Sequence, residues 1–135
     1  GDTRSTLPKV LTPKRILELQ SLVRRIPAPA NVVRHAVAMV RATRPASRQE
    51  APKTTHIAAI REYVSFGTGP RASKYLVLGA KARAALRGRP VATIDDVRAI
   101  AVPVLAHRIV TNFHAEASGV RAPELVRVVL DAMKP

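Results

Sequence analysis

The sequence predicts a small all-α domain, and three observations support this fold class. Apolar residues recur at spacings of three and four in several segments, prolines and glycines separate those segments, and alternation typical of a strand is confined to residues 63–66. With 135 residues, 47% of them hydrophobic, the chain is long enough for one domain with a buried core. We therefore expect a bundle of about five helices, with at most a very short extended segment near residues 63–66.

The first two helices are predicted by their start signals and apolar faces. Thr12 precedes Pro13, and this pair is typical of a helix start because threonine caps the first turn and proline fits the first helical position. Pro27 should end this helix, and Pro29 should open a second one. The expected inner faces are Ile16, Leu19, Val23 and Ile26 in the first helix, and Val33, Ala36, Val37 and Val40 in the second. His35 is placed on the outer side, and the short proline-rich turn predicts an antiparallel helix pair.

The middle of the chain is predicted to contain a loop, a short helix and a longer helix. Residues 44–55 are polar, contain two prolines and lack a period, which indicates a surface loop. A short helix is expected between His56 and Glu62. Pro70 should begin a third helix that stops at Gly88. Its inner face is small: Ala72, Leu76, Gly79 and Ala80.

The last third is predicted to contain two further helices. Thr93, followed by two aspartates in the first turn, is a strong start signal because the helix dipole favours acidic groups there. Pro103 should kink this helix, or split it before a helical segment that reaches Phe113. Pro123 opens the last helix. The apolar stripes are Ile94, Val97, Ile100, Ala101, Val104 and Leu105, and then Leu125, Val126, Val129 and Met133.

The charge of the chain is strongly basic and unevenly distributed. The 23 Lys and Arg residues outnumber nine Asp and Glu, for a net charge of +14, whereas residues 90–135 are balanced. This predicts that some face near the middle of the chain binds an anion. A general preference of the source organism for arginine explains most of these arginines, taken singly, equally well. The sequence has no run of 18 apolar residues for a membrane span, no visible signal peptide and no cysteine, which fits a cytoplasmic protein.

The sharpest local motif is Gly67-Thr68-Gly69-Pro70-Arg71-Ala72-Ser73. The two glycines permit close backbone approach, and a helix N-terminus presents unpaired N–H groups and the positive end of its dipole. Arg71 would lie in the first helical turn, where the dipole disfavours a cation, so a nearby anion would explain its position. Arginine donors beside backbone donors form a phosphate-binding arrangement. The alternative is a plain turn with a solvated Arg71.

The remaining polar residues do not form a catalytic constellation. The four histidines lack a glutamate at metalloprotease spacing, so no metal site is predicted. Asp95 and Asp96 would point about 100° apart on a helix, which favours capping over acid–base catalysis. For His107 and Arg108, a role in lining a site and a role in packing remain open. The chain alone is not expected to be an enzyme.

The residues of the Gly67–Arg71 turn resemble the C-terminal lid of AAA+ ATPases of the MoxR family. That family carries a motif close to Gly-x-Ser-Pro-Arg-Ala at the start of a lid helix, and here Gly69 stands where serine is usual. The similarity continues in consistent order over roughly residues 10–133. It includes the segments Leu11–Arg25, Val37–Pro45, Ala80–Asp96, Val104–Arg108 and Asn112–Gly119.

The resemblance implies a role for the turn. Arg71 would be the sensor-2 arginine that contacts the γ-phosphate of ATP, with Gly67, Gly69 and Pro70 shaping the nucleotide-facing turn. ATP and Mg²⁺ would be held mainly by a preceding α/β core, because the sequence has no Walker A motif, no strand ending in Asp-Glu and no sensor-1 strand. Residues 1–10 would then be a hinge from that core, and residues 11–135 the lid.

The resemblance also implies partners. Such ATPases form homo-oligomeric rings and act as chaperone-like remodelling machines, so the expected partners are the protein's own AAA+ core, neighbouring subunits and a von Willebrand factor A-domain protein. Two other classes remain open. The +14 charge is compatible with a basic helical nucleic-acid-binding module, although no clear recognition helix is present and aromatic residues are few. The chain could also be an oligomerisation or adaptor domain.

Overall fold

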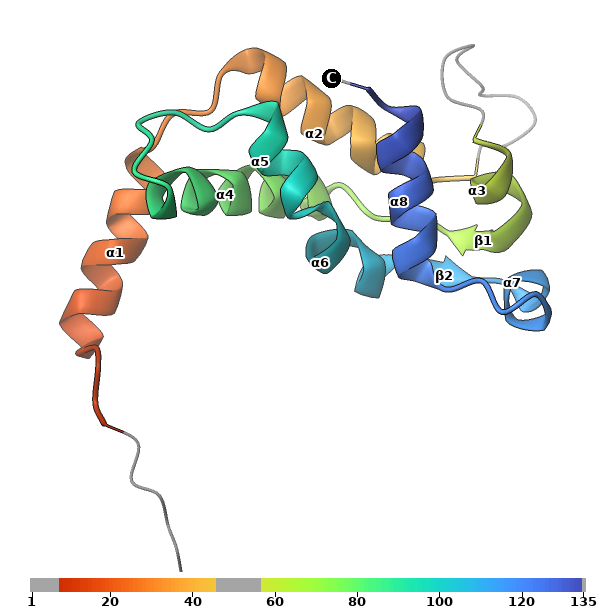
Figure 1. Cartoon of the computed structure of the whole chain (residues 1–135), viewed down its shortest axis with the longest axis horizontal. Coiled ribbons are helices and arrows are strands. Elements are labelled where there is room, and N and C mark those ends of the chain that lie inside the picture. Colours follow the sequence, from red (N-terminus) through yellow and green to blue (C-terminus); the bar gives the residue numbers. More distant parts are fainter. Residues whose placement is uncertain (1–7, 46–56, 135) are drawn as a thin grey trace, which may run out of the picture.

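The computed structural model describes residues 8–45 and 57–134. Within these residues it contains eight α-helices, one short 3-10 helix (η1) and one two-stranded sheet, so the predicted all-α class is confirmed (Figure 1). The elements are α1 (Pro13–Arg25), α2 (Ala30–Ala42), α3 (Ala58–Tyr63), β1 (Val64–Phe66), α4 (Arg71–Leu86), α5 (Ile94–Ala99), α6 (Ala101–Leu105), η1 (Ala106–Arg108), β2 (Val110–Thr111), α7 (Phe113–Ala117) and α8 (Ala122–Ala132). The number of helices exceeds the expected five because several are only one or two turns long.

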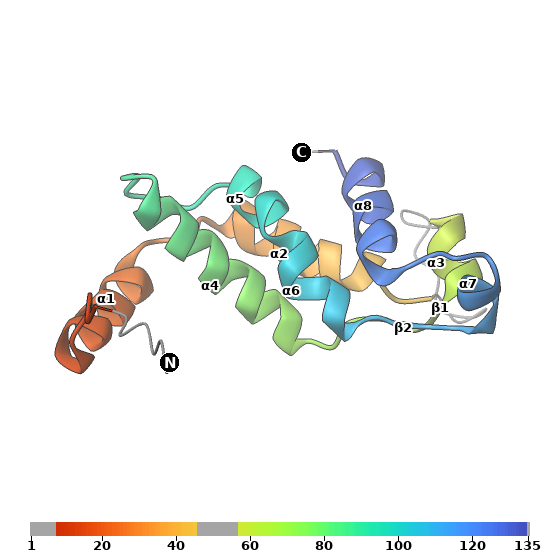
Figure 2. The same cartoon turned by 60° about the horizontal axis from the view of Figure 1, so that its bottom comes forward.

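Helix α4 is the centre of the bundle. Helices α2 and α5 pack along it, α6 packs nearer its first half, and α8 lies across α6 and α2 (Figures 1 and 2). The buried face of α4 consists of Ala72, Leu76, Ala80 and Ala84. The three alanines of this face let the neighbouring helices approach closely, and Leu76 fills the core between them. A Cβ at Gly79 would lie 2.5 Å from Cδ1 of Ile100, so this glycine makes room for the end of α5.

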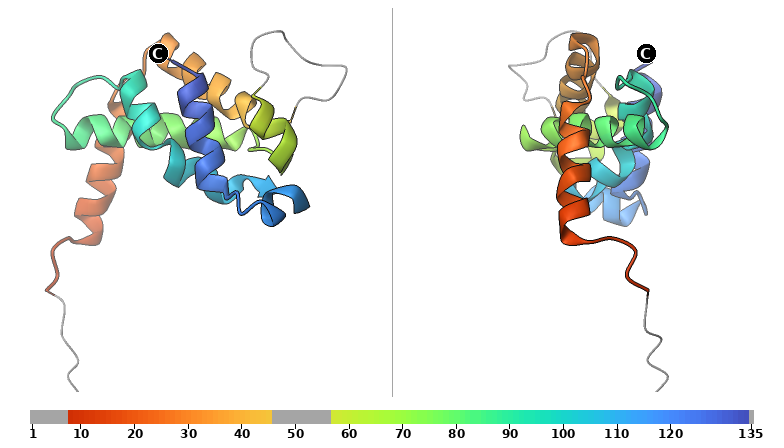
Figure 3. Two further views of the ribbon diagram at one scale, coloured as in Figure 1. Left: turned by 45° about the vertical axis from the view of Figure 1, so that its right-hand side comes forward. Right: turned by 90° about the vertical axis from the view of Figure 1, so that its left-hand side faces the viewer.

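Helix α1 does not form the expected antiparallel pair with α2. It projects from the end of the bundle and packs chiefly against α4 (Figures 1 and 3). None of its residues is buried, and Ile16 and Leu22 are 43% and 44% exposed. The extended Pro27–Pro29 link is held by a hydrogen bond from the Ala92 amide to the Pro27 carbonyl at 3.1 Å. This link directs α1 away from α2, so that prediction is wrong.

The inner face of α2 was only partly predicted. Ala36 and Val40 are buried as expected, but Val33 and Val37 are 39% and 40% exposed. Val32 and Met39 occupy the core in their place. Two apolar stripes at helical spacing run along α2, and only the position of its neighbours selects the inner one. His35 is half-buried, not on the outer side as expected.

The segment after α5 departs most from the sequence-based expectation. The helix breaks at Ile100, and Pro103 lies inside the short α6. Residues expected to continue as a helix to Phe113 form η1 and then β2, which pairs antiparallel with β1. The β-branched run Ile109-Val110-Thr111 favours this extended conformation. The predicted extended segment at residues 63–66 is confirmed as β1, and the prediction of no second strand is wrong.

The remaining expectations have mixed outcomes. Helices α3, α4 and α8 lie where the sequence predicts them, with Leu125, Val126 and Val129 of α8 buried and Met133 only half-buried. Asn112 caps α7, a helix that was not predicted, and its side-chain oxygen accepts from the Ala115 amide at 3.1 Å. The predicted loop at residues 44–55 lies almost entirely outside the described residues, as do residues 1–7 of the predicted hinge.

Candidate functional site

The turn that carries the predicted site joins β1 to α4 and is anchored to the end of α2. Thr43 and Thr68 are buried, with exposed fractions of 0% and 1%. The Thr68 amide donates to Oγ1 of Thr43 at 3.0 Å, and the two hydroxyl oxygens are 2.8 Å apart. Nε of Arg44 donates to the Thr68 carbonyl at 2.9 Å. These contacts fix the residues immediately before α4 against α2.

The two glycines of the turn differ in the space that surrounds them. A Cβ at Gly67 would lie 2.4 Å from the Thr43 carbonyl oxygen, so only glycine permits this approach to α2. At Gly69, in contrast, a Cβ would meet no atom within 4 Å. A serine, as in the related motif, would therefore fit at position 69 without displacing the turn.

Arg71 is exposed on the first turn of α4. Pro70 precedes it at the N-cap position, no side chain caps the helix, and its first turn contains no acidic residue. Within residues 8–45 and 57–134, Arg71 forms no salt bridge and no side-chain hydrogen bond. A cation at this end of a helix is unfavourable unless an anion is present. The arrangement can bind an oxyanion through the guanidinium together with the positive end of the helix dipole.

Tyr75 and Arg108 extend this end of α4, and the sequence did not single out Tyr75. Tyr75 lies four residues after Arg71, on the same helical face. The guanidinium carbon of Arg108 lies 4.9 Å from the centroid of the Tyr75 ring, at cation–π distance. Nε of Arg108 is buried and has no hydrogen-bond partner in the described part of the chain. The stack connects η1 to the start of α4 and assigns to Arg108 the packing role that the sequence left open.

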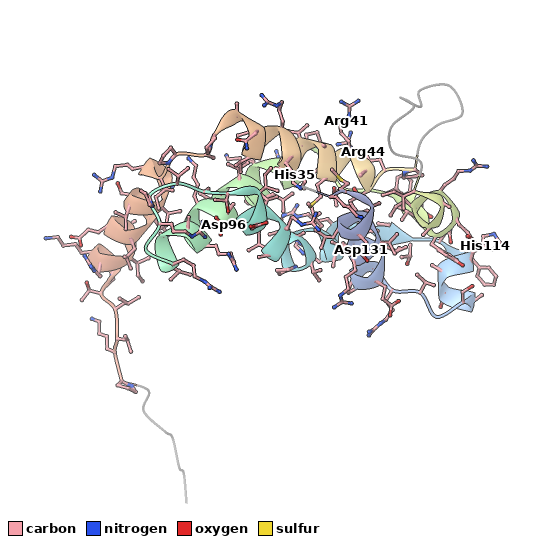
Figure 4. All side chains as sticks on the ribbon, turned by 45° about the horizontal axis from the view of Figure 1, so that its top comes forward. His35, Arg41, Arg44, Asp96, His114 and Asp131 are labelled. Atoms are coloured by element: carbon pink, nitrogen blue, oxygen red, sulfur yellow. The ribbon has the colours of Figure 1, made fainter. Side chains whose placement is uncertain are left out.

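Asp96 has a structural role, as the sequence predicted. It is buried at the start of α5 (Figure 4), and its carboxylate accepts from Arg83 at 2.7 Å and from Arg89 at 2.5 Å and 2.8 Å. It also accepts from the Thr93 amide at 2.9 Å, which completes a capping box. The Arg89 hydrogen bond holds the pKa of Asp96 well below its ordinary value, although burial acts in the opposite direction. A carboxylate held ionised in this way is poorly suited to acid–base catalysis.

His56 lies outside the described residues, and the other three histidines lie on different elements. His35 on α2 and His114 on α7 lie far apart (Figure 4). Burial, and secondarily the charge of Arg98, lower the pKa of His35. In residues 8–45 and 57–134, no group of three or more histidine, aspartate or glutamate side chains could hold a metal ion.

Comparison with known proteins assigns the family. The profile of the AAA lid domain matches residues 56–129, which is more than half of the chain. The chain belongs to the AAA lid domain family. The chain is 31% identical over 131 residues to Chaperone MoxR1 of Mycobacterium tuberculosis, covering 93% of this chain and 32% of that protein. It is 42% identical over 66 residues to Protein MoxR of Paracoccus denitrificans, covering 49% and 19% of the two chains.

A solved structure supports the same assignment. A candidate ATPase from Cytophaga hutchinsonii superposes with a TM-score of 0.80 at 25% identity, over 90% of this chain and 35% of that one. The predicted resemblance to the lid of MoxR-type AAA+ ATPases is thereby confirmed. The chain spans about a third of the length of Chaperone MoxR1 and of the Cytophaga protein. No helix in the described part of the chain is both long and apolar enough to cross a membrane.

Proposed function

We propose that this AAA lid domain serves a MoxR-type AAA+ ATPase and that Arg71 is its sensor-2 arginine. The observation that carries the proposal is the exposed guanidinium at the N-terminus of the 16-residue helix α4, which pairs with no acidic side chain among residues 8–45 and 57–134. Gly67, Gly69 and Pro70 form the turn that would face the nucleotide. In the longer protein, residues 1–10 would be the hinge from the ATPase core and residues 11–135 the lid.

In this role the arginine reports the state of the nucleotide. ATP and Mg²⁺ would be held mainly by the core, and Arg71 would donate to the γ-phosphate in a charge-assisted hydrogen bond. That bond is weakened after hydrolysis, so the orientation of the lid would follow the nucleotide. The Thr43–Thr68 hydrogen bonds and the Arg108–Tyr75 stack support this mechanism, because they join the start of α4 to α2 and η1. A displacement at Arg71 would then move the lid as one unit.

The wider function is proposed from the family relationship. We propose that the protein forms a homo-oligomeric ring in the cytoplasm, hydrolyses ATP and remodels other proteins, together with a von Willebrand factor A-domain partner. Two observations support it: the relationship to Chaperone MoxR1 and the match to the Cytophaga structure. The net charge of +14 alone does not favour a nucleic-acid-binding module over this function, since no recognition element accompanies it.

The proposal is tested by Arg71→Ala in the full-length ATPase. Loss of one charge contact to the transferring phosphoryl group should lower ATP turnover roughly tenfold to a thousandfold. Arg127→Ala is the matched control, because Arg127 is an exposed arginine of α8, on another helix. Steady-state ATPase assays with both variants, and size-exclusion chromatography to verify assembly, make the comparison. Unchanged turnover of a normally assembled Arg71→Ala protein would contradict the sensor-2 role.

A further inference from the structure

A groove with an apolar floor lies between α1, α2 and α4. It has a volume of about 600 Å³ and is lined by residues from all three helices. The apolar and aromatic side chains that line it, here called its floor, are Val33 and Val37, one turn apart on α2, and Tyr75, Val77 and Leu78 on α4. Val33, Val37 and Leu78 are 39%, 40% and 38% exposed, although both helices bury other faces in the core. Such a concentration of exposed apolar side chains in one groove is typical of an interaction site.

The rim of the groove is basic. Lys74, Lys81 and Arg24 line it, and none of its lining residues is acidic. Nζ of Lys81 donates to the Arg24 carbonyl at 3.3 Å, which holds two of these residues side by side. Lys74 and Lys81 are seven residues apart on α4, and this separation corresponds to about 10 Å, or roughly two helical turns. The positive charges therefore stand at two points along the apolar floor.

We propose that this groove binds an amphipathic helix of a partner protein, with an apolar face and acidic flanks. Apolar side chains spaced three or four residues apart would rest on Val33, Val37 and Leu78, as in other helix-in-groove complexes. Glutamates or aspartates beside them would pair with Lys74, Lys81 and Arg24, so that the charges of groove and partner are complementary. Arg71 does not line the groove, whereas Tyr75, one turn after it on α4, does. The groove is therefore a neighbouring surface, and the inference goes beyond nucleotide sensing because its ligand is a protein helix.

The first experiment uses a designed probe. A fluorescein-labelled helical peptide of 18 residues, with leucines along one face and glutamates elsewhere, is titrated with the 135-residue chain at physiological salt and followed by fluorescence anisotropy. We expect saturable binding with a dissociation constant in the micromolar range. A scrambled peptide of the same composition, whose leucines no longer share a face, should bind at least tenfold more weakly. Equal binding of the two peptides would overturn the proposal, since binding would then not depend on an apolar helical face that fits the groove.

The second experiment separates the rim from the overall charge. The double variant Lys74→Glu/Lys81→Glu should weaken probe binding at least tenfold. The variant Arg61→Glu/Arg127→Glu has the same net charge, changes exposed residues outside the groove, and should bind within twofold of the wild type. Circular dichroism verifies that both variants are folded, and Leu78→Ser tests the floor without a charge change. Equal losses in the two charge-reversal variants would overturn the proposal.

The third experiment tests whether the remainder of the same protein covers the groove. If a partner protein fills it, the full-length protein should bind the probe with an affinity within a few-fold of that of the 135-residue chain. If the remainder of the same protein covered the groove, the full-length protein would fail to bind the probe. That result would overturn the assignment to a partner, whereas the ATPase assay on Arg71→Ala would be unaffected by it.

Discussion

At the scale of single residues, two buried threonines hold the turn before α4: Oγ1 of Thr43 and Oγ1 of Thr68 lie 2.8 Å apart and fix the turn against the end of α2. Thr12 and Thr93 cap the helices that the sequence assigned to them. The contact between Thr43 and Thr68 could not be predicted, because 25 residues separate the two hydroxyls and neither belongs to a recognisable pattern. The exposure of Arg71 could be expected from its place in the first turn. The anchoring of its turn became visible only with α2 in position.

The different environments of the two turn glycines make a matched pair of substitutions. Gly67→Ala should lower the free energy of unfolding by about 1–3 kcal/mol, because the new Cβ would lie 2.4 Å from a backbone carbonyl that cannot move aside easily. Gly69→Ser should change it by less than about 0.5 kcal/mol, because that position is open. Urea denaturation followed by circular dichroism measures both. Equal effects of the two substitutions would contradict the close packing of the turn on α2.

The buried Asp96 should make the free energy of unfolding depend on pH in the acidic range. Its pKa in the folded protein lies below the ordinary value of 3.8, so the unfolded chain takes up the proton at a higher pH than the folded one. The stabilisation is therefore complete well above pH 4 and is lost as the pH falls through and below that range. Asp96→Asn should lower the free energy of unfolding by about 2 kcal/mol at pH 7 and flatten this dependence. The exposed Asp95→Asn serves as the control, and an unchanged acid dependence in Asp96→Asn would refute the assignment.

At the scale of elements, helix positions were largely predictable and helix neighbours were not. Start signals and breakers act within a few residues, so α4 begins directly after Pro70 as predicted. The orientation of α1 and the choice between the two apolar stripes of α2 depend on packing between distant segments. The strand β2 exists because β1 lies beside it, and an isolated two-residue strand has no periodic signal. These errors therefore concern tertiary contacts and not local propensity.

The link between α4 and η1 can be measured by a double-mutant cycle on Tyr75 and Arg108. Truncating each residue to alanine, singly and together, should give a coupling free energy of about 0.5–1 kcal/mol, as expected for a partly exposed cation–π pair. Tyr75→Phe should keep most of the coupling, because the ring remains. Chemical denaturation of the four proteins provides the values. A coupling free energy near zero would mean that the stack does not join the two elements energetically.

At the scale of the whole molecule, the net charge indicates the binding partner less specifically than the motif at the start of α4 does. A charge of +14 is compatible with nucleic acid, with an acidic protein partner and with a nucleotide. In the structure the basic side chains have different environments. Arg83 and Arg89 form salt bridges with Asp96. Arg108 stacks on Tyr75, and Lys74 and Lys81 line the groove. Composition could not distinguish these environments, because they depend on the neighbours that folding provides.

The isolated 135-residue chain should fold but hydrolyse no ATP. Its buried core joins residues from α2 to α8, so a cooperative helical unfolding transition is expected by circular dichroism. The sequence contains no Walker A motif and no acidic strand end to hold Mg²⁺ and activate water, so Arg71 has no bound phosphate to act on. A coupled-enzyme assay should therefore show no nucleotide-dependent turnover above background, with the full-length protein as the positive control. Saturable turnover that Arg71→Ala abolishes in the isolated chain would show that the chain holds a catalytic site of its own, and the assignment as a lid would have to be abandoned.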